Sequence, residues 1–149
     1  MANLVIKSLN VRGLRDDRKR REMFHALHKS KYNFFLLQET HSTKECETQW
    51  RTEWGGDVYY SHGTNVARGT CILIKKNVGK QVHNVIVDAN GRYVILDIEI
   101  GNIRLTLATI YGPNSDDSDF FVDLAALTEN IENDNRIIGG DFNVVFNIE

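Results

Sequence analysis

The chain has 149 residues, which suits one domain, and its 42% hydrophobic and 26% charged content is that of a globular protein able to bury a core. The formal net charge of -2 argues against a dedicated basic nucleic-acid-binding module, but acidic metal ligands in a nuclease can offset basic phosphate contacts. Its two cysteines, Cys46 and Cys71, show no CxxC spacing, which disfavours a zinc site or a disulfide framework and fits a reducing compartment.

The first part of the chain predicts a strand, a helix and a second strand. Leu4–Leu9 alternates apolar and polar residues, as a half-buried strand does. A helix capped by Asp16 or Asp17 follows and runs to about Lys29, with its Arg-Lys-Arg-Arg run on the solvated face. The uninterrupted apolar run Phe34–Leu37 then predicts a buried strand.

The rest of the chain predicts a second helix, a run of strands, a third helix and a last strand. The second helix begins at the capping-box pattern Ser42-Thr43-Lys44-Glu45 and ends at Gly55-Gly56. The later strands are predicted at Val58–Ser61, Thr70–Ile74, Val82–Val87, Tyr93–Ile100, Ile103–Tyr111 and Arg136–Ile138, and the third helix at Asp119–Ile131. Gly101-Asn102 joins two of these strands as a hairpin. This order predicts an α/β fold of two mixed sheets packed face to face and covered by helices.

Polar residues follow the first two strands, at the strand ends where α/β folds place their ligands. The Asn10 amide can bind a metal-bound water or orient a carboxylate, and the alternative is a turn asparagine bonded to its own backbone. Glu39 directly follows a fully apolar strand, where its charge is costly unless it is paired or bound to a metal such as Mg²⁺. The alternative for Glu39 is an ion pair with a nearby Arg or Lys.

Two further polar constellations follow later strands. Tyr111 and Asn114 flank a Gly-Pro turn that can direct a phenol and an amide at one phosphate, with ordinary turn punctuation as the alternative. Asp141 and Asn143 lie two positions apart after a Gly-Gly pair, so in extended geometry they face one substrate; a simple aspartate turn is the alternative. All four constellations supply oxygen and amide groups that suit hard metals and phosphate. Together they predict phosphoester hydrolysis with magnesium.

The four motifs, in this order, resemble the exonuclease III-like endonuclease/exonuclease/phosphatase superfamily. They are Leu-Asn-Val-Arg-Gly-Leu around Asn10, Leu-Gln-Glu-Thr-His around Glu39, Tyr-Gly-Pro-Asn from Tyr111 and Gly-Gly-Asp-Phe-Asn ending at Asn143. Arg12 stands where repair enzymes of the superfamily often carry an acid. The first two motifs look more like the endonuclease of LINE-type retrotransposons, which nick target DNA, and this argues against abasic-site repair.

The resemblance implies a four-layered α/β sandwich over residues 1–149, with two mixed sheets flanked by helices and incomplete at the C-terminus. It also implies Mg²⁺ as the cofactor, with Mn²⁺ as the alternative, and DNA as the partner. The implied metal-binding residues are Asn10, Glu39, Asp141 and Asn143. The implied catalytic residues are Tyr111 at the scissile phosphate, Asp141 at the attacking water and Asn143, which holds a phosphate oxygen together with Asn114. Arg12, Arg15 and the arginine run can reach a phosphate backbone, although a solvated helix face is the alternative.

Members of the superfamily end with a Ser-Asp-His segment, and here no histidine follows Asn143. We therefore expect the N-terminal portion of the domain, without its last strands and with poor stability on its own. The main hypothesis is a DNA endonuclease, with a reverse transcriptase domain downstream in the full-length element. The alternatives are an inactive truncated copy and a superfamily phosphatase acting on a non-DNA phosphoester. With no signal peptide and no apolar run that could span a membrane, we expect a location in the nucleus or cytoplasm.

Overall fold

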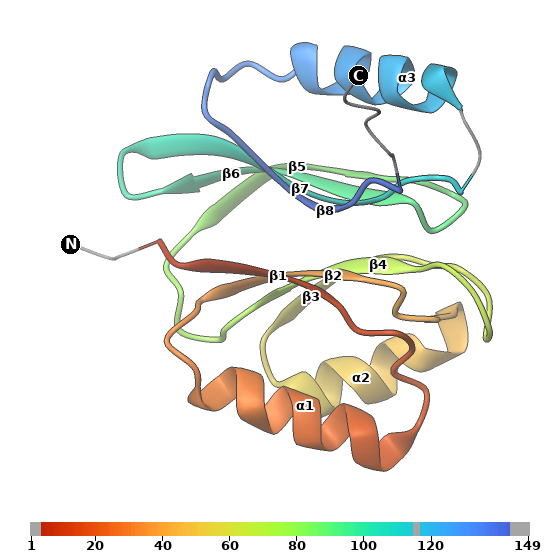
Figure 1. Cartoon of the computed structure of the whole chain (residues 1–149). Coiled ribbons are helices and arrows are strands. Elements are labelled where there is room, and N and C mark those ends of the chain that lie inside the picture. The colour runs from red at the N-terminus through yellow and green to blue at the C-terminus, as the bar shows by residue number, and fades with distance from the viewer. Residues whose placement is uncertain (1–3, 115–116, 144–149) are drawn as a thin grey trace, which may run out of the picture.

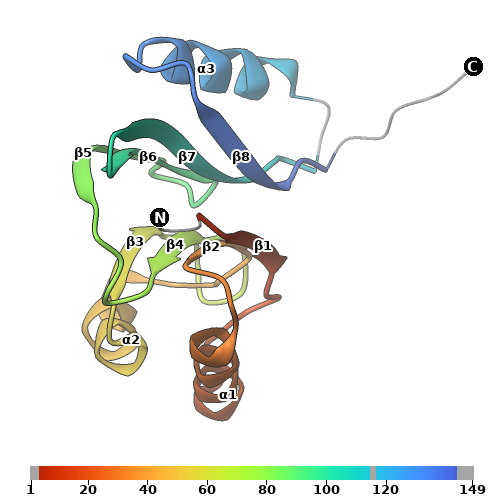
Figure 2. The same ribbon diagram turned by 90° about the vertical axis from the view of Figure 1, so that its left-hand side faces the viewer.

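Two four-stranded sheets stack face to face in the computed structural model, which describes residues 4–114 and 117–143. Helices α1 and α2 cover the outer face of one sheet, and α3 covers the outer face of the other (Figure 1). The turned view shows the same four layers, helix, sheet, sheet and helix (Figure 2). The predicted four-layered α/β sandwich of two mixed sheets is therefore confirmed.

Each sheet combines parallel and antiparallel strand pairs. The first sheet has the order β1-β2-β4-β3 and consists of β1 (Ile6–Asn10), β2 (Phe34–Gln38), β3 (Asp57–Ser61) and β4 (Thr70–Ile74). The second has the order β5-β6-β7-β8 and consists of β5 (Gln81–Val87), β6 (Tyr93–Ile100), β7 (Ile103–Tyr111) and β8 (Arg136–Asp141). The pairs β1–β2 and β7–β8 are parallel, and a helix joins the two strands of each pair. These helices are α1 (Asp17–Lys29) and α3 (Ser118–Glu129).

Three apolar layers hold the sandwich together. Phe35 and Leu37 of β2 face the helices α1 and α2, while Phe34 and Leu36 face the second sheet. This alternation explains why the whole of β2 is buried, as its apolar run predicted. The third layer lies between the second sheet and α3 and contains Ile110. The longest helix of the described residues, α1, has 13 residues, and no helix among those residues could cross a membrane.

The predicted hairpin forms between β6 and β7, with Ile100 paired to Ile103 across its turn. The last strand is longer than predicted, because β8 continues through both glycines to Asp141. A Cβ atom at Gly140 would lie 2.0 Å from the carbonyl oxygen of Ile110, so only glycine lets β8 approach β7 there.

The predicted capping box at residues 42–45 is wrong. Ser42 is fully buried, and its hydroxyl contacts Thr40 and His62 instead of a helix terminus. The chain begins its turn later, as a 3-10 helix over Lys44–Cys46 that leads into α2 (Glu47–Trp54). The local sequence permits a capping box, but the Ser42 hydroxyl forms tertiary hydrogen bonds and is therefore not available to cap the helix.

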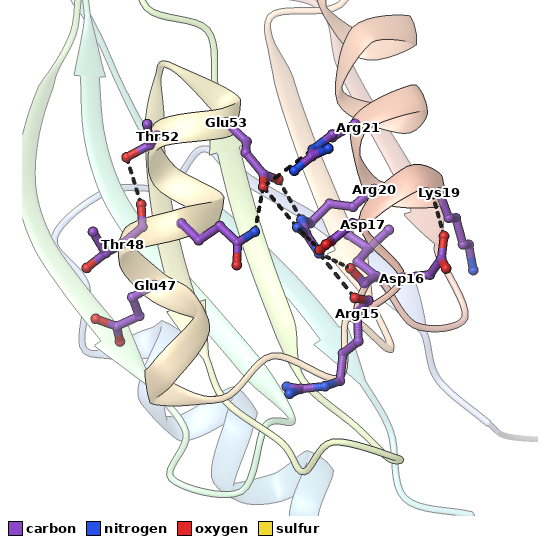
Figure 3. Close-up of polar contacts among 12 residues, drawn as sticks. Arg15, Asp16, Asp17, Lys19, Arg20, Arg21, Glu47, Thr48, Thr52 and Glu53 are labelled. Carbon is purple, nitrogen blue, oxygen red and sulfur yellow. Dashed lines mark hydrogen bonds and ion pairs between the residues drawn. The ribbon is translucent and has the colours of Figure 1, made fainter.

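The arginine run on α1 is not wholly solvated, because Arg20 is buried with 1% of its surface exposed. Its guanidinium lies 2.6 Å from the Glu53 carboxylate of α2 and 2.8 Å from that of Asp17 (Figure 3). Arg20 also donates to the Leu14 carbonyl and lies over the Trp50 ring. The arginine therefore joins α1, α2 and the loop before α1, and its hydrogen bond holds the pKa of Glu53 below the usual range.

Replacing Glu53 with glutamine removes the charge that compensates Arg20. We expect Glu53→Gln to lower the free energy of unfolding by about 3 kcal/mol at pH 7, measured by urea unfolding. The matched control is Glu22→Gln, which breaks the exposed Arg18–Glu22 pair on α1, the helix that carries Arg20, and should change the free energy of unfolding by less than about 0.5 kcal/mol.

The loss of stability caused by Glu53→Gln should also depend on pH. Because the folded pKa of Glu53 is depressed, its contribution is present above the unfolded value of about 4.3 and disappears as the pH falls through the folded value. The stabilities of the parent and the variant should therefore converge in acid. Equal losses for Glu53→Gln and Glu22→Gln would show that the buried pair has no special energetic role.

Candidate metal and phosphate site

The predicted site residues gather where the two parallel strand pairs end. Asn10 is the register partner of Gln38 at the ends of β1 and β2, and Tyr111 is the partner of Asp141 at the ends of β7 and β8. Parallel strands carry their carboxyl ends to the same edge of a sheet. The stacking of the two sheets then brings both edges to one end of the sandwich.

Asn10 and Asp141 meet across the two sheets. The Asn10 amide nitrogen lies 3.5 Å from an Asp141 carboxylate oxygen. The Asn10 side-chain oxygen accepts a hydrogen bond from the Arg12 backbone nitrogen at 3.1 Å. Asn10 therefore makes both contacts: the hydrogen bond to its own turn, which was the alternative interpretation, and the contact with the Asp141 carboxylate.

Glu39 and Tyr111 form a second pair between the sheets. The Tyr111 hydroxyl donates to the Glu39 carboxylate at 3.3 Å, and the Glu39 carbonyl accepts from the Gly13 backbone nitrogen at 2.6 Å. Burial of the Tyr111 ring and the neighbouring Glu39 carboxylate raise the pKa of the Tyr111 phenol. The phenol is therefore protonated at neutral pH and can donate a hydrogen bond.

Asn143 reaches the same region by a different geometry from the one predicted. Its backbone is left-handed, with a φ of 51°, so it does not continue the strand from Asp141. The Asn143 amide donates to the Gly112 carbonyl at 2.7 Å, and its backbone nitrogen donates to an Asp141 carboxylate oxygen at 3.1 Å. The expectation of extended geometry is wrong because β8 ends at Asp141 and the chain turns towards Gly112.

An open pocket of about 530 Å³ lies between the strand ends. It is lined by Ser8, Asn10, Gln38, Gly140, Asp141, Phe142 and Asn143. Glu39 and Tyr111 lie beside the pocket. Glu39 follows Gln38 in the chain, and Tyr111 is the register partner of Asp141. Asn114 is exposed, and within the described residues no hydrogen bond joins it to the other candidates.

Sequence reasoning missed three residues near this pocket. Ser8 and Gln38 line it. Strand alternation could have revealed Gln38, because Gln38 lies on the same face of β2 as Phe34 and Leu36. Arg92 lies over the Tyr111 ring at 5.3 Å and comes from the turn before β6, where the sequence carries no motif.

The donor set fits a hard divalent cation. Glu39 and Asp141 offer one carboxylate from each side, and Asn10 adds an amide. Mg²⁺ in proteins takes one or two carboxylates and keeps several waters, so a sparse oxygen set of this kind suits it. In the part of the chain that the structure describes, no group of three or more His, Cys, Asp and Glu side chains could hold a metal ion, so a cation here would depend on two carboxylates, the amide and water.

Left-handed backbone occurs at one residue that lines the pocket, Asn143, and at Glu39 beside it. Among the described residues, five other than glycine have a positive φ, and they are Arg12, Glu39, His41, Arg68 and Asn143. Two of them are candidate site residues, and the Arg68 carbonyl is bonded to the His41 backbone nitrogen. Such residues cost of order 1 kcal/mol or more each, and they persist only where the surrounding structure holds them.

Sequence comparison gives two matches of high coverage. A profile of the Endonuclease/Exonuclease/phosphatase family matches residues 8–147. The chain is also 32% identical over 143 residues to the transposon TX1 uncharacterized 149 kDa protein of Xenopus laevis. That alignment covers 94% of this chain but only 11% of the transposon protein.

Solved structures share the fold at lower identity. A humanized D. rerio TDP2 superposes with a TM-score of 0.70 at 18% identity, covering 95% of this chain and 67% of that one. The endonuclease domain of TRAS1, a telomere-specific non-LTR retrotransposon, gives 0.64 at 14% identity, with 93% and 59% covered. An AP endonuclease from Archaeoglobus fulgidus gives 0.64 at 18%, with 95% and 58% covered. At these identities the likeness establishes the architecture.

The close approach at Gly140 provides a test of the site's framework. Gly140→Ala places a methyl group against the Ile110 carbonyl, so we expect β8 to shift and the free energy of unfolding to fall by about 3 kcal/mol or more. The control is Gly79→Ala, where an added Cβ meets nothing within 4 Å and stability should stay within about 0.5 kcal/mol. Thermal and urea unfolding measure both variants, and a neutral Gly140→Ala would contradict this packing.

Proposed function

This chain belongs to the endonuclease/exonuclease/phosphatase family, and on that premise we propose that it hydrolyses phosphodiester bonds of DNA with the help of Mg²⁺. The observation that carries the proposal is the meeting of Asn10 with Asp141 and of Glu39 with Tyr111 across the two sheets. Asn10, Asp141 and Asn143 line the open pocket, and Glu39 lies beside it with the neutral Tyr111 phenol. This set of groups suits a metal-assisted attack of water on a phosphodiester.

In this proposal Glu39 and Asn10 hold the cation, and Asp141 and Asn143 complete its surroundings. When bound, the cation would supply charge neutralisation at the phosphate oxygens. Glu39 is anchored at two points, because its side-chain carboxylate accepts from the Tyr111 hydroxyl and its backbone carbonyl accepts from the Gly13 nitrogen. Such anchoring keeps a ligand near its productive position.

The remaining groups act on water and phosphate. The Asp141 carboxylate orients the attacking water and accepts its proton, which is general base catalysis. The Tyr111 phenol, kept protonated by its raised pKa, donates a hydrogen bond to a phosphate oxygen or to the leaving oxygen. Asn143 and Asn114 hold phosphate oxygens, and Asn114 would have to approach from its exposed turn.

DNA is the favoured substrate because of the relatives and the charges around the pocket. The similar proteins include a transposon protein and a retrotransposon endonuclease domain, and a solved D. rerio TDP2 is bound to a single-stranded DNA product. Arg12 is exposed beside Asn10 and can contact a backbone phosphate. Arg15 and Arg20 are engaged within the protein and are poorer candidates.

A retroelement origin fits these relatives, with nicking of target DNA as the biological role and a reverse transcriptase domain elsewhere in the full-length protein. The chain spans about a tenth of the transposon protein and about three-fifths to two-thirds of the three solved structures described above. The activity therefore needs testing on two proteins, this chain and the chain extended by the residues its gene encodes next.

Glu39→Ala should slow nicking strongly. We expect the parent to convert supercoiled plasmid to open circles only with Mg²⁺ or Mn²⁺, and the variant to be slower by about 100-fold or more, roughly 3 kcal/mol of transition-state stabilisation. The control is Glu129→Ala, which removes an exposed carboxylate at the end of α3 and should leave the rate unchanged. Gel densitometry of the nicked product measures the rates.

Three other outcomes are informative. A Glu39→Ala protein that nicks as fast as its parent rules out the metal assignment. Calorimetric Mg²⁺ binding without nicking in either the chain or its extended form supports the inactive-copy alternative. Hydrolysis of a non-DNA phosphoester in place of plasmid would move the protein to the phosphatase branch of the family.

A further inference from the structure

A layer of buried polar side chains separates the apolar core from the candidate site. On the inner face of the first sheet, Gln38 lies two positions after Leu36 in β2, and Thr70 lies two positions before Ile72 in β4. On the facing sheet, Thr109 follows Leu107 in the same way. The exposed fractions are 2% for Gln38 and zero for both threonines. Burial of polar groups is unfavourable unless they form hydrogen bonds, so this layer calls for a specific role.

Within this layer, Gln38 and Thr109 form a hydrogen-bonded bridge between the sheets. The Gln38 amide nitrogen lies 3.1 Å from the Thr109 hydroxyl, 3.1 Å from the Ser8 hydroxyl and 3.0 Å from the Leu36 carbonyl. The Thr109 hydroxyl in turn donates to the Leu37 carbonyl at 3.1 Å. The Leu36 carbonyl can only accept, which fixes the orientation of the Gln38 amide.

The bridge lies directly beneath the candidate site. Glu39 follows Gln38 in the chain, and Tyr111 lies two positions after Thr109 on the same face of β7. Tyr111 is also the register partner of Asp141. The bridge therefore connects the residue before one carboxylate to the strand that supports the other.

Directional bonds at this place have a purpose that apolar packing cannot serve. Apolar contacts between the sheets fix their separation, but they are non-directional and permit small sliding motions. A hydrogen bond weakens steeply with distance and angle, so the bridge opposes sliding at the end where the carboxylates must meet. In active sites a displacement of about 1 Å can lower the rate by about 100-fold.

We propose that Gln38 and Thr109 are positioning residues of the candidate site, whose hydrogen bond across the sheets fixes Glu39 relative to Tyr111 and Asp141. This inference rests on the proposed function. It assigns these two residues no contact with the cation or the phosphate. Their effect passes through the placement of Glu39.

The chain offers a matched control for this proposal in Thr70. Thr70 is a strand threonine with the same zero exposure, and it is the register partner of Gln38, yet its hydroxyl has no hydrogen-bond partner among the described residues. Thr109→Val and Thr70→Val therefore make the same isosteric change in the same layer. Only the first of them breaks the bridge between the sheets.

The test compares Thr109→Val, Thr109→Ser and Thr70→Val with the parent in the purified protein, at a temperature well below every unfolding midpoint. The readouts are the Mg²⁺ dissociation constant by calorimetry without DNA, and kcat and KM for plasmid nicking. For Thr109→Val we expect kcat to fall about 10- to 100-fold with KM within about twofold of the parent, and Mg²⁺ binding to weaken about threefold or more. Thr109→Ser, which keeps the hydroxyl, should stay within about threefold of the parent in kcat.

Thr70→Val should match the parent in all three quantities, because no hydrogen bond is lost. The positioning role is overturned if both valine variants change kcat and Mg²⁺ affinity equally, or if neither changes them while the parent is active. A parent that binds Mg²⁺ without nicking leaves the calorimetric comparison to decide the matter. A parent that neither binds Mg²⁺ nor nicks DNA overturns the proposed function itself and removes the premise of this inference.

Discussion

Apolar packing between the two sheets sets the distance between the two halves of the candidate site. Phe34 and Leu36 of β2 share one buried cluster with Leu105 and Leu107 of β7, and this cluster occupies the centre of the sandwich. Interiors of this kind are close-packed, so a change of a single methylene group is felt by the neighbours. Because Glu39 directly follows a strand of one sheet and Asp141 ends a strand of the other, the geometry of the candidate site depends on core residues that lie outside it.

The loops at the site end are held to the same framework by backbone hydrogen bonds. The carbonyls of Glu39 and Thr40 accept from the nitrogens of Gly13 and Leu14, and the nitrogens of Thr40 and His41 donate to the loop before β4. These bonds explain how Glu39 and His41 can keep left-handed backbone. The strain is sustained by neighbouring segments that are themselves anchored in buried strands.

The sequence was sufficient for most of the helices and strands and for naming the candidate residues that the structure brings near one another. Period-two alternation and apolar runs located the strands, and Tyr93–Ile100 and Ile103–Tyr111 match the observed bounds. Asn10, Glu39, Tyr111, Asp141 and Asn143 came from motifs and do lie at one end of the sandwich. Their chemical roles remain proposals, because geometry alone does not assign a role.

The features that the sequence did not reveal are those created by distant contacts. Arg20 looks like one more solvated arginine until α2 supplies Glu53, 33 residues away. The capping box failed because Ser42 is engaged by His62, and Gln38 gained its importance only from Thr109, 71 residues away. The strand order β1-β2-β4-β3 was likewise undetermined, because periodicity indicates which face is buried but not which strand lies beside it.

Each sheet is built from one continuous half of the chain, with Ile6–Ile74 forming the first and Gln81–Asp141 the second. During synthesis, all four strands of the first sheet therefore leave the ribosome before the second sheet exists. Most of the early contacts are local to one half, which favours rapid formation of each sheet. The candidate site draws its residues from both halves, so a nascent chain cannot assemble it until nearly all of these residues have been translated.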